Sequence, residues 1–156
     1  YIMIINLICI GSKPNASETK SIEYYTKQLP KNFNVNFIYL KNLSSSKLST
    51  KEIIKKESAM LLNNIPQNSY VISWDSEGKQ ISSLDFANLI KQKIKSQKSI
   101  SFLVGGSHGF NNEVKHKSDM VLSASLLTFP HKLFRLILVE QIYRAHTILA
   151  NMPYHK

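Results

Sequence analysis

A glycine-rich segment carries the strongest chemical signal in this sequence. Three of the five glycines lie in residues 105–109, Gly-Gly-Ser-His-Gly, directly after the apolar run 100–104. A buried strand that ends in such a turn exposes main-chain N–H groups and lets a ligand approach the backbone closely, as in many cofactor sites of α/β proteins. We therefore expect a ligand site at the end of this strand.

The same segment matches G-x-S-x-G, the turn that presents the nucleophile in serine hydrolases. Asp119 and His131 follow Ser107 in the chain order of that family's triad. The hydrolase fold normally needs a larger sheet and an oxyanion-hole segment, and neither is evident here. A serine hydrolase that uses Gly105, Ser107 and Gly109 is therefore one alternative function.

Motifs for phosphate, dinucleotide and metal sites are missing. The sequence contains no G-x-x-x-x-G-K-[ST], and no G-x-G-x-x-G follows the first apolar run. The single cysteine, Cys9, cannot complete a zinc site, and its apolar surroundings indicate a buried, inert thiol in a reducing cytoplasm. The histidines have no ligand-like spacing, so we predict no metal; they stand at positions 108, 116, 131, 146 and 155.

Both arginines, Arg135 and Arg144, lie in the last apolar segment of a chain whose other basic residues are eighteen lysines. A guanidinium group fits phosphate or carboxylate in two-point geometry, so this placement indicates a particular anionic ligand. Arg144 also follows Glu140 by four residues and could pair with it instead. The C-terminal residues 154–156 combine an aromatic ring, an imidazole and a cation, which suits contact with RNA.

Composition indicates one domain, residues 1–156, with an anionic partner. The chain has 156 residues, 43% of them hydrophobic, with a formal charge of +10 and a pI near 9.7. This charge favours nucleic acid, although charge alone does not choose between RNA, DNA and anionic lipid. The apolar start, residues 1–10, is too short to span a bilayer and lacks signal-peptide features, so we interpret it as a core strand.

Strand and helix patterns alternate along the chain, which predicts a mostly parallel sheet flanked by helices. A turn is predicted at 75–79 around Gly78, and Thr128 is a possible cap for the last helix. That helix is apolar nearly all round, which favours a homodimer over a monomer with a central core helix. The strands are predicted at 2–10, 33–40, 69–74, 100–105 and 120–124, and the helices at 16–29, from 50, at 82–97, at 112–117 and up to about 149.

Several segments in order resemble one family, the bacterial 23S rRNA pseudouridine methyltransferases of the SPOUT superfamily, known as the RlmH family. The likeness covers nearly the whole length and lies in residues 102–109, 122–131, 135, 139–145 and 151–156. It implies a C-terminal trefoil knot that binds S-adenosylmethionine and releases S-adenosylhomocysteine. The cofactor-binding residues implied are Trp74, Gly105, Gly106, Ser125, Leu126, Leu127, Thr128, Phe129 and Pro130.

The resemblance also implies the reaction, which is methylation of the ring nitrogen at position 3 of a pseudouridine on assembled ribosomes in the cytoplasm. His155 and Tyr154 would come from the partner subunit to orient or deprotonate the base. Arg135 or Arg144 would hold RNA phosphate or the cofactor carboxylate. The partners would be 23S rRNA and a second copy of the chain, without DNA or a membrane. A non-catalytic RNA-binding protein is the other alternative function.

Overall fold

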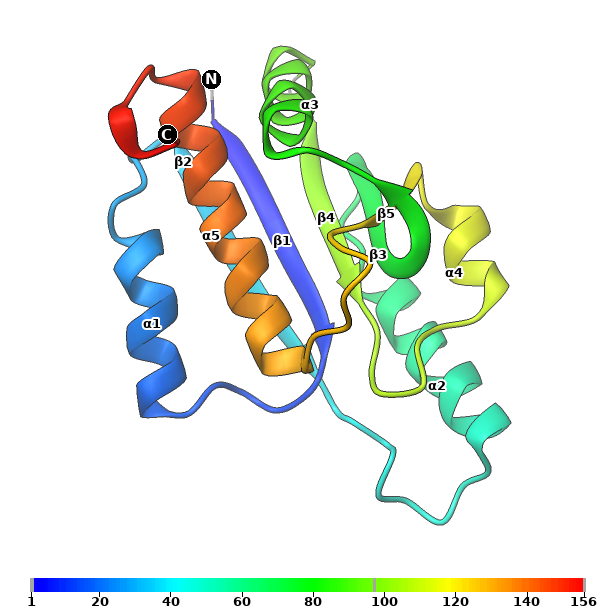
Figure 1. Ribbon diagram of the computed structural model, residues 1–156. Coiled ribbons are helices and arrows are strands. Elements are labelled where there is room, and N and C mark those ends of the chain that lie inside the picture. The colour runs from blue at the N-terminus through cyan, green and yellow to red at the C-terminus, as the bar shows by residue number, and fades with distance from the viewer. Residues whose placement is uncertain (1, 97, 156) are drawn as a thin grey trace.

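Five parallel strands form the centre of the protein (Figure 1). The structure, a computed structural model, describes residues 2–96 and 98–155, and of His155 it describes only the main chain. Along the sheet the strands follow the order β2-β1-β4-β3-β5, and every neighbouring pair is parallel. The strands are β1 Met3–Ile10, β2 Phe33–Leu40, β3 Ser69–Gln80, β4 Ser99–Val104 and β5 Met120–Ser123.

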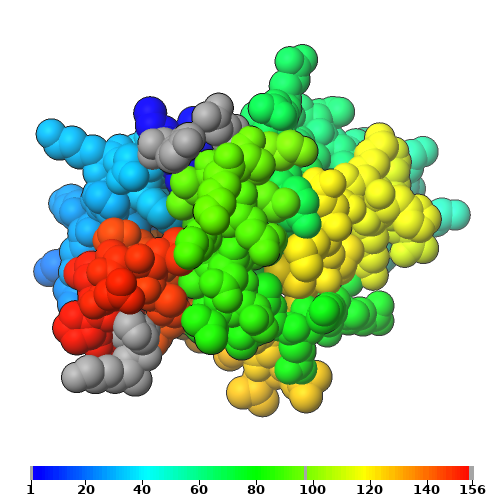
Figure 2. All heavy atoms as spheres, turned by 90° about the horizontal axis from the view of Figure 1, so that it is seen from above, coloured from blue at the N-terminus to red at the C-terminus, as the bar shows by residue number. Residues whose placement is uncertain are grey.

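Helices cover both faces of this sheet. They are α1 Ala16–Thr26, α2 Thr50–Asn63, α3 Ser83–Lys95, α4 Asn112–Lys117 and α5 His131–Leu149, followed by a 3-10 turn, η1 Pro153–His155. Helices α1, α3 and α5 pack on one face, and α2 and α4 pack on the other. From above, α3 in green lies between the red C-terminal segment and the yellow α4 (Figure 2). The predicted α/β class is confirmed, and the trefoil knot stays a prediction.

Polar side chains define where the first four helices begin. Each of these helices follows a residue whose side-chain oxygen accepts a hydrogen bond from the main-chain N–H three positions later: Asn15, Ser49, Ser82 and Asn111. Helix α5 differs because Pro130 precedes it and no side chain caps it. The predicted cap by Thr128 is therefore wrong.

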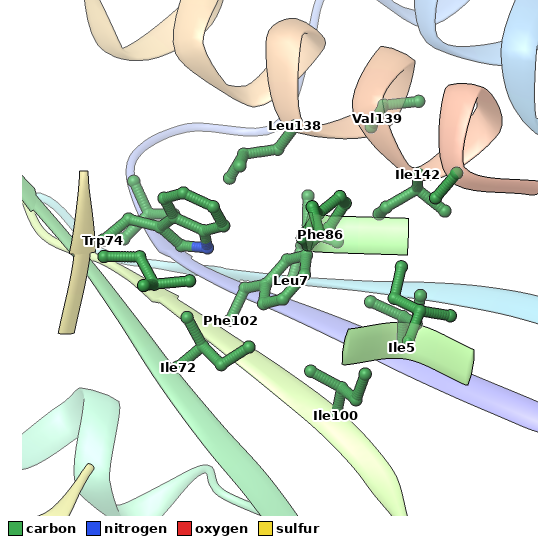
Figure 3. Close-up of a cluster of buried hydrophobic side chains, with 14 of the residues drawn as sticks. Ile5, Leu7, Ile72, Trp74, Phe86, Ile100, Phe102, Leu138, Val139 and Ile142 are labelled. Atoms are coloured by element: carbon green, nitrogen blue, oxygen red, sulfur yellow. The ribbon is translucent and has the colours of Figure 1, made fainter. Parts of the chain in front are cut away.

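An aromatic cluster joins the sheet to α5. The rings of Trp74 and Phe102 meet edge to face with centroids 5.5 Å apart, and Phe86 of α3 approaches Trp74 in the same way at 6.1 Å. Leu138 and Ile142 of α5 are fully buried in the same core (Figure 3). This packing holds α5 along the sheet, so that the helix begins beside the carboxyl ends of the strands (Figure 1).

Strand β3 is longer than its sequence pattern predicts. It continues to Gln80, so the turn expected at 75–79 is wrong. Its pairing with β5 shifts register between Trp74 and Lys79, which marks a bulge or irregularity in the strand. At Gly78 an added Cβ would lie 2.6 Å from the main-chain carbon of Leu122. The glycine therefore serves a close approach of two backbones instead of a turn.

Other boundaries and the cysteine follow the sequence closely. The helix predicted at 16–29 ends at Thr26, and the one predicted to reach Gln97, a residue outside the described part, ends at Lys95. Cys9 is buried in β1, as predicted, and this burial raises the pKa of its thiol to about 12. Within the described residues, no helix has the length and apolar character needed to cross a membrane.

Candidate functional site

A cavity of about 280 Å³ lies where β4, β5 and the regularly paired part of β3, residues 69–74, end. Because β4, β3 and β5 are adjacent and parallel, their carboxyl ends meet at one edge of the sheet, where such sheets commonly hold ligands. The volume is near the lower end of the range for small-molecule sites. Its walls come from residues 74–76, 104–107, 109–110, 123–125 and 127–129 and from the first turn of α5.

The glycine-rich segment forms a tight turn on one side of this cavity. The N–H of Gly109 donates to the carbonyl of Gly106 at 2.9 Å, and Gly109 has a φ of +73°, which favours glycine. Gly106 lies against the interior, because an added Cβ would meet Glu57 Oε1 at 2.8 Å and Ile10 Cγ2 at 3.1 Å. The main chain of Gly105 and Gly106 thus borders the cavity, and the ligand contact predicted for it stays a prediction.

The same turn is not joined to the other two residues of the hydrolase alternative. Ser107 is an exposed residue inside the turn. Asp119 is held by the backbone of Val71, which donates its N–H to Asp119 Oδ2 at 2.7 Å and accepts the Asp119 N–H at 2.8 Å. Within the described residues, no hydrogen bond joins Ser107, His131 and Asp119. The arrangement therefore lacks the contacts that a catalytic triad needs.

The loop that follows β5 forms a second wall of the cavity. Ser123 Oγ donates to the carbonyl of Ser125 at 3.0 Å, and Ser125 Oγ accepts the N–H of Leu127 at 2.9 Å. The cavity is lined by Ser125, Leu127, Thr128 and Phe129, whereas Leu126 and Pro130 are not part of its lining. Counting Trp74, Gly105 and Gly106, seven of the nine residues predicted to bind cofactor surround one cavity.

Trp74 forms part of the wall and has an unused hydrogen-bond donor. Its side chain is buried, and Nε1 has no partner within residues 2–96 and 98–155. A buried N–H without a partner is unfavourable by about 1–3 kcal/mol, and this nitrogen is buried, so it is not presented to the cavity surface. With Phe110 and Phe134 nearby and glycine main chain opposite, the walls fit a nucleoside, which has a flat apolar ring and polar edges.

His131, at the start of α5, also lines the cavity. Burial, with a smaller contribution from the neighbouring Arg135, lowers its pKa below the usual 6.5, while Glu57 acts in the opposite direction. The unfolded chain therefore binds this proton first as the pH falls below 6.5, and the folded state loses stability there.

Urea midpoints measured between about pH 5 and about pH 7.5 should therefore fall toward the acid end of this range. We expect this fall to be smaller for His131→Gln than for the unsubstituted protein. An unchanged decline would contradict this.

A family of known proteins, described as "Predicted SPOUT methyltransferase", matches residues 3–155 of this chain. The chain belongs to the SPOUT methyltransferase family. It is 36% identical over 154 residues to the ribosomal RNA large subunit methyltransferase H of Caldicellulosiruptor saccharolyticus, with 98% of this chain and 100% of that protein covered. The protein of the same name from Clostridium botulinum strain Hall is 38% identical over 159 residues, covering 99% and 100%.

A solved structure, the SpoU methyltransferase AviRb from Streptomyces viridochromogenes in complex with the cofactor AdoMet, has a TM-score of 0.42 and 11% identity. The match covers 94% of this chain and 58% of that one. The family assignment rests on the sequence matches and makes this SPOUT protein an enzyme of methyl transfer.

The two arginines of this SPOUT methyltransferase do not line the cavity. Arg135 is only 3% exposed; its Nη1 donates to the carbonyl of Ser12 at 2.7 Å and its Nη2 to Glu18 Oε2 at 3.3 Å. Arg144 pairs with Glu140 at 2.7 Å, as the four-residue spacing allowed. Both guanidinium groups thus have partners in their own chain, and their predicted contacts with RNA or cofactor stay predictions.

Tyr154 lies along α5, well away from the cavity of its own chain. Its hydroxyl donates to Glu140 Oε1 at 3.0 Å, and Glu140 follows His131 by nine residues, about 14 Å along the helix axis. Burial and this hydrogen bond to the carboxylate raise the pKa of Tyr154. The phenol therefore stays protonated near neutral pH and is unsuited to act as a general base. The predicted role of the His155 side chain lies outside the described residues.

Sequence reasoning missed several residues of the cavity wall. Asp75 and Ser76 were interpreted as a turn, and Phe134 as part of an apolar helix pattern, yet all three line the site. Lys115 of α4 holds Asp75 in place with an ion pair of 2.8 Å. Asp75 and Ser76 could have been found from the expected topology, because residues that follow adjacent parallel strands meet at one edge of the sheet.

Proposed function

We propose that this SPOUT methyltransferase transfers the methyl group of S-adenosylmethionine to the N3 atom of a pseudouridine in 23S rRNA. The observation that carries the proposal is the cavity at the ends of β3, β4 and β5, bordered by glycine main chain and the 123–129 loop. Relatives named ribosomal RNA large subunit methyltransferase H match the chain over their full length, which supports rRNA as the substrate class. The charge of +10 supports a nucleic-acid partner.

S-adenosylmethionine, when bound, supplies an electrophilic methyl group whose bonding electrons return to sulfur as the N3 lone pair forms the new bond. The chain must then hold the two reactants in line and accept the N3 proton. Gly105, Gly106 and Phe129 would bind and orient the cofactor, and the Trp74 side chain would form part of the wall around it. The aromatic walls would exclude water from the reacting atoms.

A small domain with dispersed lysines and no separate RNA-binding unit favours a structured substrate. We therefore propose that the assembled ribosome, in the cytoplasm, is the substrate, and that the lysines supply salt-dependent affinity. Equal methylation of a naked hairpin RNA and of ribosomes would argue against this part of the proposal.

We further propose a homodimer in which the C-terminal segment of one chain completes the cavity of the other. Tyr154 is held about 14 Å along α5 from His131, so Tyr154 does not reach the cavity of its own chain in this conformation. Leu133, in the first turn of α5, is 46% exposed, and Leu127 of the cavity wall is 72% exposed. A second copy covering these apolar side chains would bring its own tail near the site.

His155→Ala should lower the methylation rate by about 100-fold and leave cofactor binding unchanged, because removal of a general acid or base acts on the chemical step. A variant that methylates at the full rate would remove His155 from the mechanism.

Paired tags on two co-expressed chains allow purification of a heterodimer of His155→Ala with Gly106→Val. If the tail acts in the partner's cavity, one of the two sites is intact and about half of the activity returns. If the tail acts in its own chain, neither site is intact and the heterodimer stays inactive.

Calorimetric titration with S-adenosylmethionine tests the function directly, followed by mass mapping of the methylated rRNA fragment. Trp74 is the only tryptophan, so its fluorescence should change in the same titration. RNA binding without any cofactor heat or fluorescence change would favour a non-catalytic RNA-binding protein. Labelling by a fluorophosphonate that disappears in Ser107→Ala would favour the hydrolase.

A further inference from the structure

A buried carboxylate lies behind the cavity wall. Glu57 of α2 is only 1% exposed. One of its oxygens, Oε2, accepts the main-chain N–H of Leu43 at 2.8 Å, whereas Oε1 has no hydrogen-bond partner in the described part of the chain. None of the ion pairs found among the described residues involves Glu57. The fold therefore retains a buried negative group whose second oxygen is unused.

The unused oxygen points at the turn that borders the cavity. A Cβ built on Gly106 would lie 2.8 Å from Glu57 Oε1, so this oxygen lies against the Gly106 residue that borders the cavity. At His131, which lines the same cavity, Glu57 acts to raise the pKa, although burial and Arg135 lower it more. The Glu57 side chain thus lies close to the site on the side of Gly106.

The charged neighbours of the cavity are paired among themselves, although at His131 the positive charge of Arg135 has a larger effect than the negative charge of Glu57. Arg135 lies close enough to lower the pKa of His131, but its guanidinium pairs with Glu18, which Lys132 also approaches at 3.4 Å. Asp75, the acidic residue in the wall itself, pairs with Lys115 at 2.8 Å. Glu57 is therefore the acidic group near the described cavity wall that lacks a counter-charge.

A buried carboxylate without a partner is unfavourable, and a cation placed nearby offsets this. The methyl donor of the proposed reaction carries a sulfonium charge, whereas its product is a neutral thioether that differs by this charge and one methyl group. We infer that Glu57 makes the cavity prefer the charged donor over the neutral product, which favours product release after each transfer. This inference rests on the proposed function.

The test compares two ligands in matched variants. Glu57→Gln keeps a side-chain oxygen for the Leu43 N–H and removes the charge. Calorimetry should show S-adenosylmethionine binding weakened roughly tenfold, with S-adenosylhomocysteine binding changed less than about twofold. Glu23→Gln, which removes a partly exposed carboxylate paired with Lys27 on α1, is the charge control and should leave the ratio of the two affinities unchanged.

The outcomes separate the two claims. If the unsubstituted protein binds neither ligand, the proposed function fails. If it binds both and Glu57→Gln weakens them equally, Glu57 only supports the loop at Leu43 and the inference is overturned. If Glu57→Gln does not fold, Glu57→Asp is the second variant, because it keeps the charge and moves it away by one methylene. The preference for S-adenosylmethionine over S-adenosylhomocysteine should then fall by about twofold to threefold. An unchanged preference overturns the inference.

Discussion

Replacing Arg135 with methionine should lower the free energy of unfolding by about 2–4 kcal/mol, because the hydrogen bonds that the buried guanidinium donates to the Ser12 carbonyl and to Glu18 are both lost. The guanidinium joins α5 to the segment after β1 through the Ser12 carbonyl and Glu18, and it lies 5.0 Å from the ring centre of Tyr39. Its loss would leave the Ser12 carbonyl without this donor and Glu18 with Lys132 alone, at 3.4 Å.

Urea denaturation measures this effect as a lower midpoint at constant slope. Arg144→Met is the matched control, because this partly exposed side chain pairs with Glu140 on the same helix and should change stability by less than about 1 kcal/mol. Normal stability of Arg135→Met together with weakened cofactor or RNA binding would contradict the structural role and support the ligand role that the sequence predicted.

Replacing Gly78 with alanine should destabilise the protein by about 3 kcal/mol and weaken cofactor binding as well. The added Cβ would lie 2.6 Å from the main-chain carbon and 2.8 Å from the carbonyl oxygen of Leu122. A backbone cannot rotate away as a flexible side chain can, so β5 would have to move. Because β5 leads into Ser123 and Ala124 of the cavity wall, the site should distort with it.

Urea midpoints and cofactor titration on the same samples measure both effects. Gly109→Ala is the control: an added Cβ there meets no atom within 4 Å, and only the φ of +73° opposes it. We expect this variant to lose about 1 kcal/mol, the usual penalty for a side chain in left-handed backbone. Equal stability of Gly78→Ala and the unsubstituted protein would mean that β3 and β5 are not so closely apposed.

Much of the fold was predictable from local patterns. The strand at 33–40 and the helix at 112–117 were predicted with the observed bounds, and Ser82 begins its helix as a side-chain cap. Such signals depend on nearby residues, because side-chain direction and capping follow from sequence spacing. The same reasoning failed for β3, because the partner that extends it, β5, lies some forty residues further along the chain.

The sequence by itself determined the alternation of strands and helices, the positive charge and the glycine turn after β4, since each of these depends on residue type and short spacing. Only the tertiary structure decided that Arg135 faces Ser12, that Glu57 lies behind Gly106, and that Asp75 borders the cavity. These contacts join residues far apart in the chain, so they depend on the order of strands in the sheet and on which helix packs against which face.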